Sequence, residues 1–380
     1  MARSPLAPAA LLAASFLTAA PAGAQTVGSL ELVGQAVVPF SQPFDGGPVV
    51  GISGLTHLAG DTYLGISDVT DAAPFYVLTI DIGEDGTAPT LAWRERRQFR
   101  NPHTADGTWA DGSLDPEAIA YDPEADVVYW VSESRGGTNT PVFMLKAKTD
   151  GTPIGEVAIN DKYDHTRGQT AAGALTQGIF GSAGFESLTF APDGSALFAA
   201  PEDTLVQDGP SSKSGDGATG HARIIRYVPH GDTFAAAAEY VYEVSPREDT
   251  TSGDGANSLV DLLAIDDTTL LALEREWPDT PGTTPPSRNI KIFEIGLADA
   301  TDVRDVASLA EAEFTPVTKR LVLDLDTLVA ADNGVDGVLS YEALIFGPDL
   351  ADGRRSLIML NDNDGERDNQ LLVFAVNPAD

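Results

Sequence analysis

The 380-residue sequence contains no cysteine. Disulfides, thiol nucleophiles and cysteine metal ligands are therefore all excluded. A domain of this length can nevertheless bury enough apolar surface to be stable through its core alone. The five histidines show no spacing typical of a zinc site, so we expect any metal centre to use oxygen ligands.

Basic residues are scarce. The chain has 23 Lys and Arg against 57 Asp and Glu, for a formal net charge of −34 at pH 7. Such a charge repels nucleic acid and anionic membranes and attracts cations. We therefore expect no nucleic-acid partner, and we expect most of the acidic side chains simply to keep the surface soluble.

Long hydrophobic runs are also missing, apart from residues 9–20 near the N-terminus. That run is shorter than the roughly 20 residues that span a bilayer, so we expect no membrane insertion. It follows Arg3 and precedes Ala22-Gly23-Ala24, which is typical of a signal-peptide cleavage site. We expect residues 1–24 to be a signal peptide, the mature chain to begin at Gln25, and the protein to be periplasmic or secreted.

Several catalytic motifs do not occur. The sequence has no G-x-S-x-G nucleophile elbow, no P-loop, no dinucleotide fingerprint and no H-E-x-x-H. Together with the lack of cysteine, this favours activated water over a covalent side-chain nucleophile if the protein is a hydrolase.

The sequence does contain a repeat of short apolar runs. The clearest copy joins residues 115–123 to residues 127–133 through a tight turn, and the other copies begin near residues 52, 185, 260 and 341. The runs are bounded by Gly, Asp and Pro, a pattern typical of many short strands rather than helices. Two further runs follow in most copies, which gives four strands per unit.

The last unit lacks its fourth run, and a strand predicted over residues 30–38 belongs to no unit. A β-propeller closes its ring when a strand from one terminus completes the blade formed by the other. The sequence therefore predicts one all-β domain over residues 25–380, with five four-stranded blades and residues 30–38 paired with residues 370–376. A sixth blade built from the long loops is the alternative. We expect a monomer.

Two positions of the aligned copies are almost wholly acidic. The first is occupied by Ser53, Glu117, Glu186, Asp261 and Glu342, and the second by Asp68, Glu133, Glu202, Glu274 and Asp362. In an up-and-down blade, the start of the first strand and the end of the second emerge on one face. We therefore expect both sets to converge on one mouth of the central channel.

Carboxylates gathered in this way need neutralising, because each pair about 7 Å apart repels by about 2 kcal/mol at an effective dielectric of 20. Bound cations, protons held at a raised pKa, or the arginines Arg135 and Arg275 can offset the repulsion. Alternatively, the Glu side chains accept N–H bonds from the neighbouring blade and lock the ring. Oxygen ligands suit a hard divalent cation, and Ca²⁺ fits best. The predicted metal ligands are Glu117, Glu186, Asp261, Glu342, Asp68 and Asp362.

Five sequence blocks resemble the phytase-like family, also described as "esterase-like activity of phytase". They are Gly51–Leu55, Asp115–Ile119, Gly184–Leu188, Leu273–Arg275 and Tyr341–Pro348. The resemblance spans residues 49–377 and implies an exported bacterial propeller that hydrolyses esters. The chain departs from the family pattern at Tyr341-Glu342-Ala343-Leu344, in place of Ile-Glu-Gly-Leu, and at Asp261, in place of Glu.

Two functions from different classes stay open. One is a metal-dependent hydrolase of phosphoric or related esters acting on a small, possibly anionic, molecule. Its outer ligands or general bases would be Glu133, Glu202 and Glu274, and Arg135 and Arg275 would orient the leaving group. The other is a non-catalytic propeller that binds a ligand or a protein partner and holds structural cations in its channel.

Overall fold

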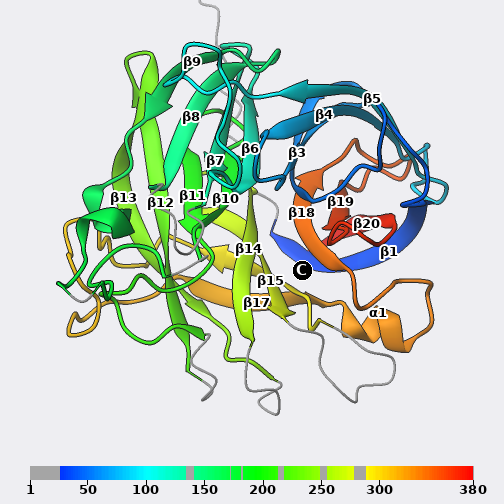
Figure 1. Ribbon diagram of the computed structural model, residues 1–380. Helices are drawn as coiled ribbons and strands as arrows, with labels where there is room; N and C mark the ends of the chain where they lie inside the picture. Colours follow the sequence, from blue (N-terminus) through cyan, green and yellow to red (C-terminus); the bar gives the residue numbers. More distant parts are fainter. Residues whose placement is uncertain are drawn as a thin grey trace, which may run out of the picture.

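The computed structural model describes residues 26–133, 141–171, 173–180, 183–212, 218–248, 255–277 and 288–379. Its strands β1–β20 form five antiparallel sheets of four strands each, arranged as the blades of a propeller (Figure 1). The predicted five-bladed architecture is confirmed. The predicted signal peptide, residues 1–24, lies outside the described residues.

The blades follow one another along the chain, and each runs from the channel outward. Blade one comprises β2 (Ile52–Ala59), β3 (Thr62–Ser67), β4 (Pro74–Asp81) and β5 (Thr90–Gln98). Blade two comprises β6 (Pro116–Asp122), β7 (Val127–Ser132), β8 (Phe143–Lys148) and β9 (Pro153–Val157). Blade three comprises β10 (Phe185–Phe190), β11 (Leu197–Pro201), β12 (Gly220–His230) and β13 (Thr233–Val244).

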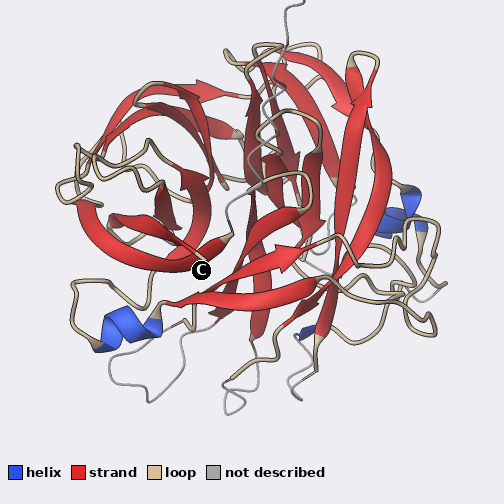
Figure 2. Ribbon diagram, turned by 180° about the vertical axis from the view of Figure 1, so that it is seen from behind, coloured by secondary structure: helices blue, strands red, loops and turns tan. Residues whose placement is uncertain are grey.

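Blade four comprises β14 (Ala256–Ala264), β15 (Thr269–Trp277), β16 (Lys291–Gly296) and β17 (Thr318–Asp324). Blade five comprises β18 (Ser340–Phe346), β19 (Ser356–Asp362), β20 (Asn369–Pro378) and the N-terminal β1 (Val27–Val38). The helices η1 (Asp161–Tyr163), η2 (His165–Arg167) and α1 (Asp326–Ala330) are short and lie in loops outside the blades (Figure 2). No described helix is long and apolar enough to cross a membrane.

Strand β1 closes the ring, as the sequence predicts. It pairs with β20 from Val27 opposite Pro378 to Val38 opposite Asn369, so the blue and red ends of the chain lie side by side in Figure 1. The innermost strands β2, β6, β10, β14 and β18 each contact the next, and β18 contacts β2. The ring is therefore continuous, and β20 leaves no open edge for another chain to pair with.

The core lies between the blades. Each pair of adjacent blades buries one apolar cluster, so the five interfaces around the ring hold five clusters. The inner strands are buried on both faces, which explains why they appear in the sequence as continuous apolar runs rather than alternating ones.

A buried ionic network fixes the long loops above blade three. The guanidinium of Arg223, on β12, is fully buried and donates two hydrogen bonds to Asp208, at 2.6 and 2.8 Å. It also lies 3.2 Å from Glu239, which pairs with Lys162 of η1 at 2.6 Å. The network ties η1 and the loop that holds Asp208 to strands β12 and β13 of blade three.

The closing role of β1 predicts a difference between two substitutions on this strand. Leu30 is 9% exposed and packs in a core cluster, whereas Val37 is 52% exposed. Leu30→Asp should lower the free energy of unfolding by about 3 kcal/mol or more, because it buries a carboxylate in apolar surroundings. Val37→Asp should change it by less than about 0.5 kcal/mol. Denaturant titration measures both, and equal effects would mean that β1 does not close the ring in solution.

The ionic network predicts a second difference. Arg223→Met should cost about 3–5 kcal/mol of unfolding free energy, because Asp208 stays buried without its cation and Glu239 keeps only Lys162. Arg226→Met is the matched control on the same strand, since Arg226 is part of a looser pair with Asp267, at 3.5 Å. It should cost less than about 1 kcal/mol. A similar cost for the two variants would show that the network does not hold these loops.

Candidate functional site

A β-bulge re-aims one side chain at the start of every inner strand. The pairing register shifts between Ile52 and Gly54, Pro116 and Ala118, Phe185 and Ser187, Leu259 and Asp261, and Tyr341 and Ala343. The extra residue at these points is Ser53, Glu117, Glu186, Val260 and Glu342. Because bulges turn a side chain out of the regular alternation, three blades aim a buried glutamate at the channel.

The bulges border a cavity of about 510 Å³ at one mouth of the channel. Eight of its lining residues are acidic and one is basic. The structure brings together the following residues predicted from the sequence: Asp68, Glu117, Glu133, Glu186, Glu202, Glu342, Asp362 and Arg275. The rest of the lining consists of Ser53, Gly255, Ala256, Ser258, Trp277 and Asp364. Arg135 lies outside the described residues.

Blade four departs from the predicted alignment by one residue. Val260 occupies its bulge, so Asp261 corresponds to Ala118 and not to Glu117. On the next strand, Arg275 is paired with Ser258 in the way that Asp362 is paired with Ser340. A one-residue shift turns a strand side chain to the opposite face, so blade four contributes Arg275 where the other blades contribute carboxylates.

Asp261 and Glu274 therefore lie away from the acidic cavity. Asp261 accepts the N–H groups of Leu262, at 2.8 Å, and Leu344, at 2.7 Å, and so ties blade four to blade five. This is the ring-locking arrangement that the sequence left open as an alternative. Glu274 is 1% exposed and pairs with Lys319 at 2.5 Å. Its carboxylate also accepts hydrogen bonds from the Tyr242 hydroxyl, the Ser245 amide and the Asn257 side chain.

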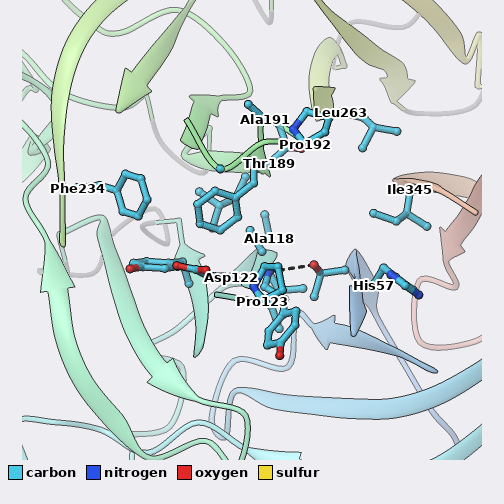
Figure 3. A pocket seen from close by; sticks show the side chains of 18 of the residues that line it. His57, Ala118, Asp122, Pro123, Thr189, Ala191, Pro192, Phe234, Leu263 and Ile345 are labelled. Atoms are coloured by element: carbon cyan, nitrogen blue, oxygen red, sulfur yellow. Dashed lines mark hydrogen bonds between the residues drawn. The ribbon is translucent and has the colours of Figure 1, made fainter. Parts of the chain in front are cut away.

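Asp261 lines a second cavity, of about 910 Å³, formed by the far halves of the inner strands and the turns that follow them. Figure 3 shows part of its wall, including Thr189, Leu263 and Ile345. Its lining mixes apolar and polar side chains. Neither of the groups of converging carboxylates found in the described residues belongs to it. The larger cavity is therefore not where the acidic chemistry lies.

Some carboxylates at the acidic mouth have a cation beside them. Arg275 forms an ion pair with Glu342 and donates to the Ser340 hydroxyl. Burial lowers the pKa of Arg275, but four surrounding carboxylates outweigh this and raise the pKa above its ordinary value, so the guanidinium stays charged. Arg288 pairs with Asp364 at 2.9 Å. Burial raises the pKa of Glu342, and Arg275 opposes that rise.

Glu117 and Glu186 differ from Glu342 and Asp364, which are paired with arginines. They are 6% and 9% exposed, and no described residue donates a hydrogen bond to either carboxylate. Burial raises the pKa of Glu117 well above its ordinary value, and Glu186 and Glu133 raise it further. Burial also raises the pKa of Glu186 well above its ordinary value, with added repulsion from Glu133, Glu202 and Glu342 and only partial relief from Arg275.

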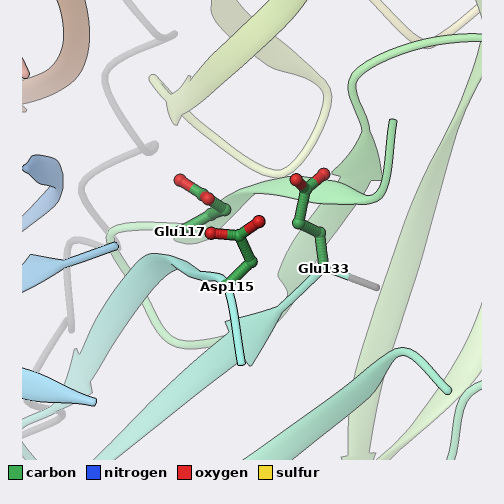
Figure 4. Close-up of side chains that lie close together, drawn as sticks. All are labelled: Asp115, Glu117 and Glu133. Atoms are coloured by element: carbon green, nitrogen blue, oxygen red, sulfur yellow. The ribbon is translucent and has the colours of Figure 1, made fainter. Parts of the chain in front are cut away.

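Carboxylate oxygens converge at two points that share Glu133. One group is Asp115, Glu117 and Glu133, and the other is Glu133, Glu186 and Glu202; within each group the oxygens lie within 4.8 Å of one another. Figure 4 shows the first group at the ends of adjacent strands. Glu133 reaches between blades two and three because residue 184 is glycine. A Cβ there would lie 2.2 Å from the Cβ of Glu133.

Sequence reasoning missed four residues of this site, namely Asp115, Ser258, Trp277 and Asp364. One of them had a signal in the strand pattern. Trp277 lies two residues after Arg275 on β15, the spacing that places strand side chains on the same face. Asp115 precedes the bulge at Glu117, and Ser258 and Asp364 are brought to the cavity by pairing and by a turn.

Solved structures that are similar to this chain are distant from it in sequence. The Dos1 propeller has 9% identity and a TM-score of 0.35, covering 87% of this chain and 70% of the other. A GH43_12 protein from a capybara gut metagenome has 11% identity and a TM-score of 0.41, covering 91% and 57%. A gluconolactonase from Xanthomonas campestris has 8% identity and a TM-score of 0.35, covering 95% and 99%. Because these TM-scores lie below 0.5, the architecture of this chain rests on its own sheet pairing.

None of the curated proteins compared with this chain matches it. A family model does match. It covers residues 47–365, which include all five bulges and every described residue that lines the acidic cavity. The chain therefore belongs to the phytase-like family, described as "esterase-like activity of phytase".

Proposed function

We propose that this protein is an exported, monomeric ester hydrolase that uses a divalent cation, with Ca²⁺ the best fit, to act on small anionic esters at the acidic mouth. One observation supports this above the others. Carboxylate oxygens converge within 4.8 Å, and among them Glu117 and Glu186 accept no hydrogen bond from any described residue. The esterase-like description of the family agrees with the proposal.

The repulsion within the site is large enough to require a counter-charge. At 4.8 Å and an effective dielectric of 20, each pair of carboxylates repels by about 3 kcal/mol. Three such pairs would use most of a typical folding stability of about 5–15 kcal/mol. Glu342 forms an ion pair with Arg275. No described arginine or lysine pairs with Glu117 or Glu186. A bound cation is the simplest counter-charge.

The donor set fits a hard cation. Every side chain in the two groups offers carboxylate oxygen, and Ca²⁺ takes six to eight oxygen ligands. Asp115, Glu117 and Glu133 would hold one ion, and Glu133, Glu186 and Glu202 a second. Such an ion lowers the pKa of a bound water and offsets the charge of an anionic ester.

The remaining residues have roles of their own. Arg275 is held by Glu342 and Ser340, so its guanidinium is positioned to bind an anionic group of the substrate. Glu133 and Glu202 lie close enough to the same point to accept a proton from water. Glu274 is not assigned a role in the chemistry, because its carboxylate is bonded to Lys319 and Tyr242 outside the cavity.

The first test is turnover on a panel of phosphoric and carboxylic esters, with and without a chelator. We expect hydrolysis of at least one ester class, loss of that activity in chelator, and recovery when Ca²⁺ is added back. A non-catalytic binding protein would hydrolyse none of them under either condition. Activity that is unchanged by the chelator would exclude a role for the metal.

Glu186→Gln is the sharpest substitution, because it removes one charge at nearly constant shape. Ca²⁺ binding, measured by calorimetry, should weaken, and turnover should fall at least about a hundredfold. Glu243→Gln is the control, since Glu243 is exposed on the outer strand of blade three. Unchanged turnover together with unchanged metal content in Glu186→Gln would remove this carboxylate from the chemistry.

The raised pKa of Glu186 also predicts how stability varies with pH when no metal is present. The folded protein retains a proton that the unfolded chain releases above about pH 4.3. This contribution to stability is therefore complete below that pH and is lost as the pH rises through the raised pKa. In chelator, the wild type should lose more unfolding free energy than Glu186→Gln as the pH rises above about 4.3. Excess Ca²⁺ should remove most of the loss in the wild type. Parallel pH profiles in chelator would contradict the account.

A further inference from the structure

An exposed indole stands at the rim of the acidic cavity. Trp277 is the last residue of β15 and lines the cavity, yet it is 51% exposed. No described ring or cation stacks on it, and its Nε1–H donates to no described residue. Large apolar side chains left open beside a polar site often serve as contact surfaces for a ligand.

Strand register places Trp277 beside Arg275, the one basic residue in the described lining of the cavity. Arg275 and Trp277 are two residues apart on β15 and are paired with Ser258 and Ala256 of β14. Side chains two residues apart point to the same face of a strand, about 7 Å from one another. Blade four therefore presents a guanidinium and an indole side by side.

The neighbours of Trp277 on the wall are small, so the indole is not covered from that side. Ala256 and Gly255 line the cavity next to it. Gly255 has a φ of +150°, and a Cβ at this position would lie 2.4 Å from the carbonyl oxygen of Trp277. Only glycine lets the chain pass this close to the end of β15.

The cavity is thus divided into two sides. Blades one, two, three and five contribute its carboxylates, whereas blade four contributes Arg275 and Trp277, the only basic and only aromatic residues among its described lining. A ligand with an anionic group at one end and a flat ring at the other would match Arg275 and Trp277 in order. A ligand without a ring would leave the indole in water.

We propose that Arg275 and Trp277 form a substrate-binding subsite that selects anionic esters of ring-bearing alcohols over esters of small acyclic ones. The inference rests on the proposed function only in taking the bound anion to be an ester. The predicted binding of an anion attached to a ring does not depend on that function. Stacking of a ring on the indole is expected to strengthen binding by about tenfold.

The test compares two phosphonates that differ only in the ring, phenylphosphonate and methylphosphonate. Neither is hydrolysed, so calorimetry on the full mature chain in Ca²⁺ buffer measures binding without turnover. We expect the wild type to bind phenylphosphonate about tenfold more tightly. Trp277→Ala should abolish that preference while leaving methylphosphonate binding unchanged, and Trp277→Phe should retain most of it. Leu321→Ala, at a residue 48% exposed on β17 of the same blade, is the matched control and should behave like the wild type.

The outcomes separate this inference from the proposed function. If Trp277→Ala loses the ring preference but no ester is ever hydrolysed, the subsite stands and the hydrolase proposal fails. If the wild type shows no ring preference, or if Trp277→Ala weakens both phosphonates equally, the stacking subsite is wrong even where esters are hydrolysed. For an active enzyme, Trp277→Ala should raise KM for phenyl phosphate and leave KM for glycerol phosphate unchanged. With glucose 1-phosphate as a third substrate, the same comparison shows whether a sugar ring stacks as an aromatic one does.

Discussion

Repulsion between buried carboxylates at one end of the channel is the constraint on which the rest of the site depends. Ring closure brings five inner strands together, and the bulge at the start of each aims one side chain inward. Three of those side chains are glutamates, and the following strands add more acid. The protein neutralises part of this negative charge itself, because Arg275 forms an ion pair with Glu342. No described arginine or lysine pairs with Glu117 or Glu186, and the proposal assigns their counter-charge to a bound cation.

The surrounding fold is stable enough to tolerate the free-energy cost of repulsion between these carboxylates. Five apolar clusters fill the interfaces between blades, and β1 completes the last sheet, so the ring does not depend on any one contact at the mouth. Other buried acidic side chains in the molecule are satisfied internally, as Asp261 is by two backbone amides and Glu274 by Lys319. Asp261 and Glu274 are therefore carboxylates that hold the ring together. Glu117 and Glu186, which accept no hydrogen bond from a described residue, are carboxylates available to a cation.

The fold was largely predictable because each blade shows its four strands as apolar runs bounded by turn residues. The N-terminal strand could be assigned to β20 because it was the one run without a unit and the last unit lacked a strand. The acidic residues of the site were predictable in blades one, two, three and five. In blade four the acidic residues Asp261 and Glu274 suggested an alignment that is wrong by one residue. The error arises because a bulge adds one residue to the strand, and residue types alone do not reveal where the bulge lies. The full set of partners of Arg223 was not predictable, since it includes the carbonyl of Val306, 83 residues away.

Anomalous diffraction from crystals grown with Mn²⁺ in place of Ca²⁺ tests the central claim most directly, because it locates the counter-charge without relying on activity. The account predicts a peak within ligand distance of Glu133, Glu186 and Glu202, or of Asp115, Glu117 and Glu133, with the bulge glutamate of that group turned toward it. A cavity without an anomalous peak, in which Glu117 and Glu186 are hydrogen-bonded as protonated acids, would contradict it.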